Sequence, residues 1–170
     1  MRAVLKRLDA ELTEARARGM AVLAAISFLI IMGWVGYLTF FVHWGETYKY
    51  GYDFSSFWAA AKLATVGNAE WAFDIEVFDP LQDLAAKSSG VLYWHYPPTF
   101  VALIYPLGHV SPGAALAWFT VLTVLVWGVT VYIMIDTKSW IERLPVLLCP
   151  ALYMTIIGGQ NGAFTAALLC

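Results

Sequence analysis

One stretch of the sequence, residues 20–42, runs for 23 residues without a charged side chain. At about 1.5 Å per residue, a helix of this length crosses the roughly 30 Å hydrocarbon core of a bilayer. A second uncharged stretch covers residues 114–135. The composition agrees, because only 13% of residues are charged against about 25% in soluble domains. We therefore predict an all-α, polytopic membrane protein, and its net charge of −2 gives no basis for nucleic-acid binding.

Basic residues predict the orientation of the chain. Residues 1–19 hold five Lys or Arg in a predicted amphipathic helix, whereas residues 43–93 hold three. Cytoplasmic segments are enriched in Lys and Arg. We therefore expect residues 1–19 at the cytoplasmic surface, 20–42 as the first transmembrane helix and 43–93 as an outer loop. Residues 94–170 are then further membrane segments of the same incomplete domain.

The outer loop contains two predicted helix starts. Asp53 or Ser55 is suited to cap a helix that ends at Gly67-Asn68. Asp79-Pro80 predicts a second start, since Asp is a good N-cap and Pro suits the first helical position. Both helices are too short to cross a bilayer, and the surrounding aromatic residues favour the interface. We expect both to lie along the outer membrane surface.

The topology after residue 98 has two solutions. Residues 99–110 are apolar but too few for a regular span, so they either cross as a broken helix or dip in and return. If they cross, the glycine-rich break at 158–162 faces the cytoplasm. If they return, the break faces outward.

Asp53 is the first candidate for chemistry. It lies just outside the first span between two aromatic residues, where a partly desolvated carboxylate suits general-base work. The competing interpretation is a helix N-cap, and the two roles are compatible. His95 is either a ligand or acid for a phosphate, or an interfacial packing residue. No His, Cys or carboxylate pair has metal-ligand spacing, so no metal site is expected.

Gln160 and Asn161 are two adjacent amides inside an apolar stretch. They must find hydrogen-bond partners, because an unsatisfied polar group in lipid costs several kcal/mol. The surrounding glycines break the helix. The pair is either a hydrogen-bonding joint between helices or a substrate-lining break that faces a cavity.

Taken together, four motifs resemble glycosyltransferase family 87, a bacterial polytopic family formerly catalogued as a domain of unknown function. The motifs are Tyr52-Asp53-Phe54, Trp71-Ala72-Phe73-Asp74, Tyr96-Pro97-Pro98 and Gly159-Gln160-Asn161. The known members are polyprenol-phosphate-mannose-dependent mannosyltransferases. The resemblance implies the N-terminal part of a GT-C-like fold in the bacterial inner membrane. Family members are much longer, so we expect a fragment that is inactive alone.

The resemblance also implies the chemistry. Asp53 would be the general base, and a mannose-like hexose would pass with inversion from a polyprenyl phosphate to an acceptor hydroxyl on the outer face. The residues expected to bind substrate are Tyr52, Lys49, His95, Tyr96, Gln160 and Asn161. The expected partners are a lipid-linked sugar donor, a lipid or glycan acceptor and the bilayer, with no cofactor.

A second class of function stays open at this point. A transporter or assembly subunit would use residues 158–162 as a broken-helix site. That function predicts the two amides at the midplane of a path through the membrane, with Asp53 exposed and unpaired. The transferase predicts Asp53 over an outward-facing cleft. A truncated gene product without function is a third possibility.

Overall fold

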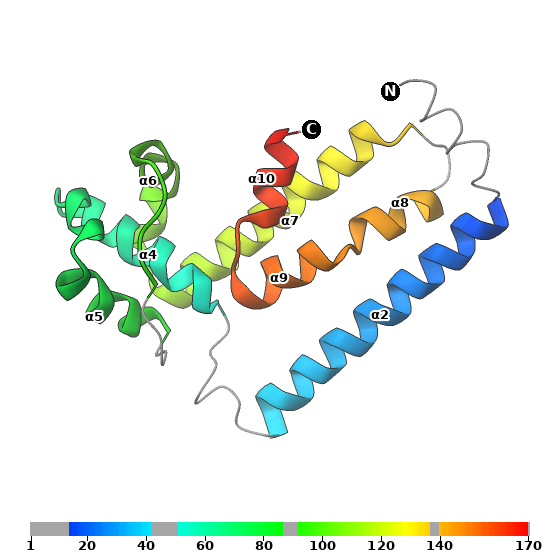
Figure 1. Cartoon of the computed structure of the whole chain (residues 1–170), viewed down its shortest axis with the longest axis horizontal. Helices are drawn as coiled ribbons and strands as arrows, with labels where there is room; N and C mark the ends of the chain where they lie inside the picture. Colours follow the sequence, from blue (N-terminus) through cyan, green and yellow to red (C-terminus); the bar gives the residue numbers. More distant parts are fainter. Residues whose placement is uncertain (1–13, 42–50, 87–91, 137–139, 170) are drawn as a thin grey trace.

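The computed structural model describes residues 14–41, 51–86, 92–136 and 140–169, and these residues form helices without any strand. The helices are α2 Glu14–Phe41, α4 Tyr52–Thr65, η1 Ala69–Phe73, α5 Ile75–Ala85, α6 Pro98–Ile104, η2 Tyr105–His109, α7 Pro112–Met134, α8 Trp140–Leu147, α9 Pro150–Gly158 and α10 Gly162–Leu169. A bundle contains α2 and α7 to α10, and a lobe at one end contains α4 to α6 with the 3₁₀ helices η1 and η2 (Figure 1). The predicted all-α, polytopic fold class is confirmed.

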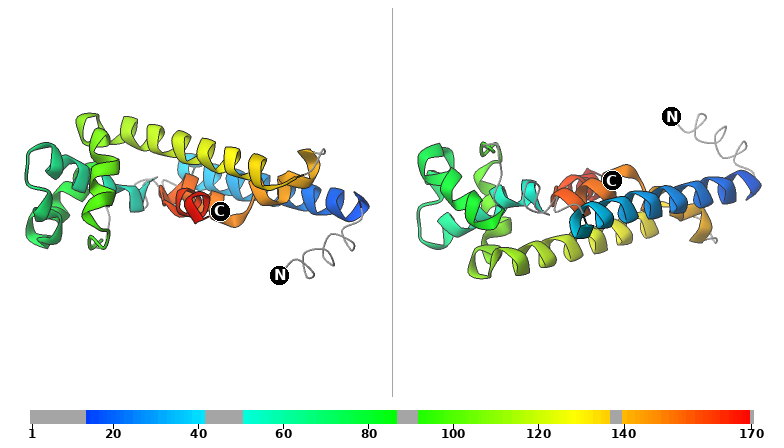
Figure 2. Two further views of the ribbon diagram at one scale, coloured as in Figure 1. Left: turned by 90° about the horizontal axis from the view of Figure 1, so that it is seen from above. Right: turned by 90° about the horizontal axis from the view of Figure 1, so that it is seen from below.

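Two helices are long and apolar enough to cross a membrane, over Ala15–Leu38 of α2 and Pro112–Met134 of α7. They run in opposite directions, so the first residues of α2 and the last residues of α7 lie at the end away from the lobe (Figures 1 and 2). They overlap the predicted spans 20–42 and 114–135, although α2 already includes Glu14 and residue 42 lies outside the described residues. The molecule is therefore a membrane protein.

The side chains of these two helices suit a lipid environment. Large apolar residues on both helices are more than half exposed, which is the arrangement expected where lipid, and not water, covers the helix. Examples are Leu23, Leu29, Ile30, Trp118, Leu125 and Ile133.

The helices α8, α9 and α10 complete the bundle. α8 and α9 are separated by Leu148 and Cys149 and are bent relative to each other. If the two helices together form one broken span, it is the third candidate span among the described residues. α8 packs against α2 and α7, and α9 and α10 pack against each other and α7. α9 ends at Gly158 and α10 begins at Gly162, as the predicted break requires.

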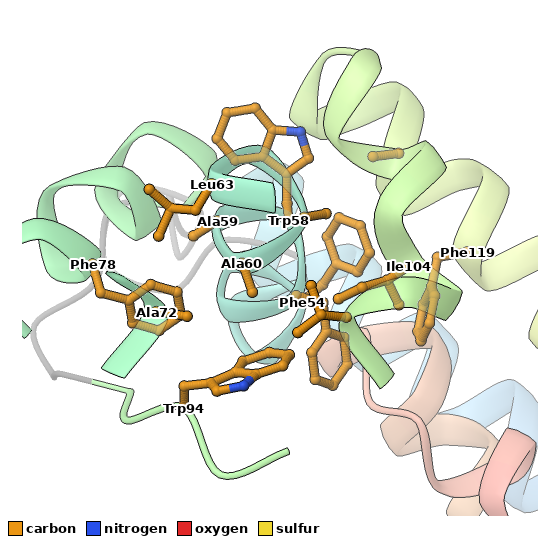
Figure 3. Close-up of a cluster of buried hydrophobic side chains, with 14 residues drawn as sticks. Phe54, Trp58, Ala59, Ala60, Leu63, Ala72, Phe78, Trp94, Ile104 and Phe119 are labelled. Carbon is orange, nitrogen blue, oxygen red and sulfur yellow. The ribbon is translucent and has the colours of Figure 1, made fainter. Parts of the chain in front are cut away.

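The helix α4 is the centre of the lobe, with the other lobe elements and α7 around it (Figure 3). Residues 54–61 are all buried, so α4 is the core helix of the lobe, and its predicted place at the membrane surface stays a prediction. Gly108 of η2 makes this packing possible. A Cβ at that position would lie 2.4 Å from the carbonyl oxygen of Ala61, so only glycine lets the two backbones approach this closely.

The second lobe helix begins earlier than the sequence predicts. Asp74 is the N-cap of α5, and its side chain accepts a 3.1 Å hydrogen bond from the backbone N–H of Glu76. The predicted cap at Asp79 is wrong, because Pro80 lies inside α5. A proline there removes one hydrogen bond to the carbonyl of Glu76, which is an exposed residue that water can reach.

The structure decides between the two topologies after residue 98. Residues 98–109 form the short helices α6 and η2, which pack against α4 and stay within the lobe. They do not cross the bundle, and the break at 158–162 lies at the same end as the lobe (Figure 1). The alternative with a crossing in this stretch is therefore wrong.

Part of the predicted organisation lies outside the described residues. This holds for residues 1–13 of the predicted amphipathic segment and for residues 42–50 and 87–91 of the predicted outer loop. The placement of α5 at the membrane surface stays a prediction.

Candidate functional site

The side chains of Asp53 and Gln160, 107 positions apart in the chain, meet at the junction of lobe and bundle. The Nε2 atom of Gln160 donates a 2.6 Å hydrogen bond to Oδ2 of Asp53. The Gly-Gln-Asn break therefore reaches the first turn of α4, and the break faces Asp53.

Asp53 does not cap its helix. The N-cap of α4 is Gly51, without a side-chain cap, and Asp53 is the second residue of the helix. The predicted cap at Ser55 is also wrong, because its Oγ donates to the carbonyl oxygen of Tyr52. The carboxylate of Asp53 is consequently available for another role.

Glycines bring the two segments together. The backbone N–H of Gly51 donates a 3.0 Å hydrogen bond to the carbonyl oxygen of Ile157 at the end of α9. Gly51 and Gly159 both have left-handed backbone conformations, with φ of 74° and 67°. A Cβ on Gly159 would lie 2.5 Å from Cβ of Phe54 and 3.2 Å from Cα of Gly51. The approach of the two backbones thus depends on glycine; we call it the glycine joint, defined by Gly51, Ile157 and Gly159.

A polar cavity of about 330 Å³ opens beside the Asp53–Gln160 pair. Its lining residues are Asp53, Ser56, Phe57, Leu92, Tyr93, His95, Tyr96, Gln160 and Asn161. They come from α4, the extended segment before α6, and the break between α9 and α10. The structure thus brings five of the predicted site residues to one cavity.

A second cavity, of about 210 Å³, is apolar. Its lining residues are Phe100, Leu103, Ile104, Pro106, Leu107, Trp118, Phe119, Leu122, Thr123 and Phe164. The ring of Phe57, which lines the polar cavity, contacts the rings of Phe100 and Phe119 at centroid distances of 5.3 and 5.5 Å. Phe100 and Phe119 line the apolar cavity, so aromatic rings in contact with one another lie between the two cavities.

The sequence model of the family described as glycosyltransferase family 87 matches residues 94–170. Residues 94–170 are therefore similar to this family. A search of curated proteins and a search of solved structures gave no significant match. The match covers the Tyr-Pro-Pro and Gly-Gln-Asn motifs, whereas Asp53 precedes it and is tied to it by the contact with Gln160.

Tyr96 is another titratable group of the polar cavity. Burial raises the pKa of its phenol, and the negative charge of Asp53 raises it further. A side-chain hydrogen bond with Asn161 acts in the opposite direction. The phenol is therefore protonated at neutral pH and is a hydrogen-bond donor. One face of its ring stacks on Phe100, with centroids 4.7 Å apart.

Not every predicted residue belongs to the polar cavity. Tyr52 lies in the first turn of α4 and is not among the residues that line it. Lys49 lies outside the described residues. Among the described residues, no group of three or more His, Cys, Asp or Glu side chains is placed to hold a metal ion.

Sequence reasoning missed two polar residues of the cavity. Ser56 follows Asp53 by three positions, which places both on one side of a helix. The second missed residue is Tyr93. Tyr93 and the predicted His95 are exposed and alternate with the buried Trp94, which is the pattern of an extended segment. Helical and period-two spacing were therefore the signals that could have found them.

Proposed function

We propose that this protein is a membrane glycosyltransferase that moves a mannose-like hexose from a polyprenyl-phosphate donor to an acceptor hydroxyl at the outer membrane face. One observation carries the proposal: the carboxylate of Asp53 lies in a polar cavity and is held there by Gln160. A carboxylate in that setting can take a proton from a hydroxyl placed in the same cavity. The match of residues 94–170 to a glycosyltransferase family supports the role of such a hydroxyl as acceptor.

Each step of the transfer has a group to carry it. Asp53 takes the proton of the acceptor hydroxyl, and the acceptor oxygen attacks the anomeric carbon of the donor sugar. The bond between that carbon and the phosphate oxygen breaks, and the phosphate leaves with the electron pair. Attack opposite the leaving group inverts the anomeric centre. Tyr96 and His95 line the cavity and are suited to donate hydrogen bonds to the sugar or phosphate. Lys49, which lies outside the described residues, stays a substrate ligand expected from the sequence.

The apolar cavity supports a donor that carries a lipid. It is bounded by α6, η2 and α7. Phe100 in its lining contacts Phe57, which lines the polar cavity. An isoprenoid tail would bury apolar surface there while the sugar phosphate occupies the polar cavity. Holding both substrates in register at one site supplies a large part of the rate enhancement.

Charge distribution supports an outward-facing site in a bacterial inner membrane. The start of α2 and the helix α8 lie at the end of the bundle away from the lobe (Figure 1), and these segments contain Arg16, Arg18 and Arg143. Among the described residues of the lobe, Lys62 is the only Lys or Arg. The positive-inside rule then places the N-terminus in the cytoplasm and the lobe outside.

Cysteine labelling checks this orientation. Glu76 and Asp136 are both exposed, one in the lobe and one at the opposite end. A membrane-impermeant maleimide is expected to label Glu76→Cys in intact cells, and Asp136→Cys only after permeabilisation. The unchanged protein, with its own cysteines, is the blank. The reverse labelling pattern would show that the site faces the cytoplasm.

Donor exchange tests the reaction itself. Membranes that contain the protein from its complete reading frame are expected to transfer labelled mannose from polyprenyl-phosphate mannose. A nucleotide sugar alone, with synthesis of the lipid donor blocked, is expected to give no product. Product formation directly from the nucleotide sugar would contradict the lipid-linked donor.

The alternative of a transporter or assembly subunit loses its main support. It required Asp53 to be exposed and unpaired, whereas Asp53 is half-buried and bonded to Gln160. No described feature favours that alternative over the transferase.

A further inference from the structure

Gln160 lines the polar cavity, and its side-chain amide faces Asp53. Its side-chain Nε2 is engaged at 2.6 Å by Oδ2 of Asp53. Within the part of the chain that the structure describes, Oδ1 of Asp53 accepts no hydrogen bond. The two oxygens of the carboxylate therefore differ: one is fixed by the protein and the other is left for an incoming hydroxyl.

The surroundings restrict where the carboxylate can point. A Cβ on Gly158 would lie 3.1 Å from Oδ2, so the backbone of the break itself is close to this oxygen. The glycine joint holds that backbone against the first turn of α4. The break thus presents Gln160 to the first turn of α4, where its amide bonds to Asp53.

From this arrangement we propose that Gln160 is a positioning residue. It fixes the carboxylate of Asp53 so that Oδ1 points to the acceptor hydroxyl, and it does not itself bind substrate. The inference rests on the proposed function, in which Asp53 is the general base. It also narrows the expected role of Gln160, which the sequence predicts as a substrate-binding residue.

The hydrogen bond from the Gln160 amide to one oxygen of Asp53 is expected to affect the rate of the chemical step. Misplacement of the base weakens proton transfer in the transition state, whereas the binding of sugar donor and acceptor depends on other groups. Loss of the amide should therefore lower kcat and leave KM nearly unchanged. A hydrogen bond to a charged group corresponds to a change of roughly 10- to 100-fold in kcat.

Two variants of Gln160 test the proposal in membranes that contain the protein from its complete reading frame. Gln160→Met keeps the length of the side chain and removes the donor. We expect it to lower kcat by about 10- to 100-fold with KM for both substrates within about threefold. Thr165→Ala is the matched control on α10, because the side chain of Thr165 is exposed, and it is expected to behave as the unchanged protein.

Gln160→Glu adds a readout that a purely structural role would not affect. A glutamate has nearly the same shape and donates a hydrogen bond only while it is protonated. Its rate relative to the unchanged protein is expected to rise as the pH is lowered, whereas that of Gln160→Met, which has no donor at any pH, is not expected to rise. The other titratable groups that line the cavity, Tyr93, His95 and Tyr96, are common to both proteins and cancel in the ratio.

The possible results separate this inference from the proposed function. A raised KM with unchanged kcat in Gln160→Met would make Gln160 a substrate ligand and overturn the inference. A pH-independent ratio for Gln160→Glu would also overturn it, even if Gln160→Met were too unstable to assay. Full activity of a protein without the Asp53 carboxylate would overturn the proposed function instead.

Discussion

Replacement of Asp53 by Asn is expected to lower the transfer rate by about 10²- to 10⁴-fold, the usual contribution of a general base. Asn has the same shape as Asp but cannot accept a proton. The change does not remove a helix cap, because Gly51 and not Asp53 occupies the N-cap position of α4. The measurement is the transfer of labelled mannose from polyprenyl-phosphate mannose by membranes with equal amounts of protein.

Two controls make this result specific to Asp53. Glu76→Gln removes an exposed carboxylate from the same lobe and is expected to leave the rate unchanged. The midpoint of thermal unfolding of Asp53→Asn in detergent is expected to stay within a few degrees of the unchanged protein. Transfer at a near-normal rate by Asp53→Asn would show that another group takes the proton.

Substitution of Gly159 by Ala is expected to unfold the site. A left-handed conformation costs a residue with a side chain about 1–2 kcal/mol. The new Cβ would lie 2.5 Å from Cβ of Phe54 and 3.2 Å from Cα of Gly51, and both belong to a tightly packed segment. Overpacking of this kind adds about 1–3 kcal/mol. We expect a clear drop in the midpoint of thermal unfolding and loss of transfer, since Gln160 moves away from Asp53.

Gly162 supplies the matched control for this prediction. It lies three positions further along, at the start of α10, and a Cβ there would meet no atom within 4 Å. Gly162→Ala is therefore expected to keep both the unfolding midpoint and the transfer rate. Equal behaviour of the two variants would show that the close approach at Gly159 does not hold the site together.

The predictability of the fold differs between its parts. The spans were predictable, because a run without charges of the right length has one stable state in a bilayer. The start of α5 was not, because Asp74 and Asp79 are both suitable caps and only the packing of the lobe selects the first. The course of residues 98–109 was also open, since a short apolar run suits both a broken span and a buried lobe helix.

The site was predictable as a set of residues and not as a geometry. Asp53, Gln160 and Asn161 stood out because polar groups in apolar surroundings need partners. Nothing in the sequence showed that Asp53 and Gln160 are partners of each other. That depends on backbone conformations of Gly51 and Gly159 that only the folded chain reveals. The sequence also allowed a capping role for Asp53, which the structure contradicts.

The hydrogen bond between Asp53 and Gln160 also has a consequence in time. The two residues are 107 positions apart, and membrane proteins are synthesised and inserted from the N-terminus onward. At about 5–20 residues per second, roughly 5–20 seconds pass between the synthesis of the aspartate and that of its glutamine partner. During that interval the lobe has its base but no amide to orient it. The pair therefore forms only after the break between α9 and α10 has been made and has docked on the start of α4.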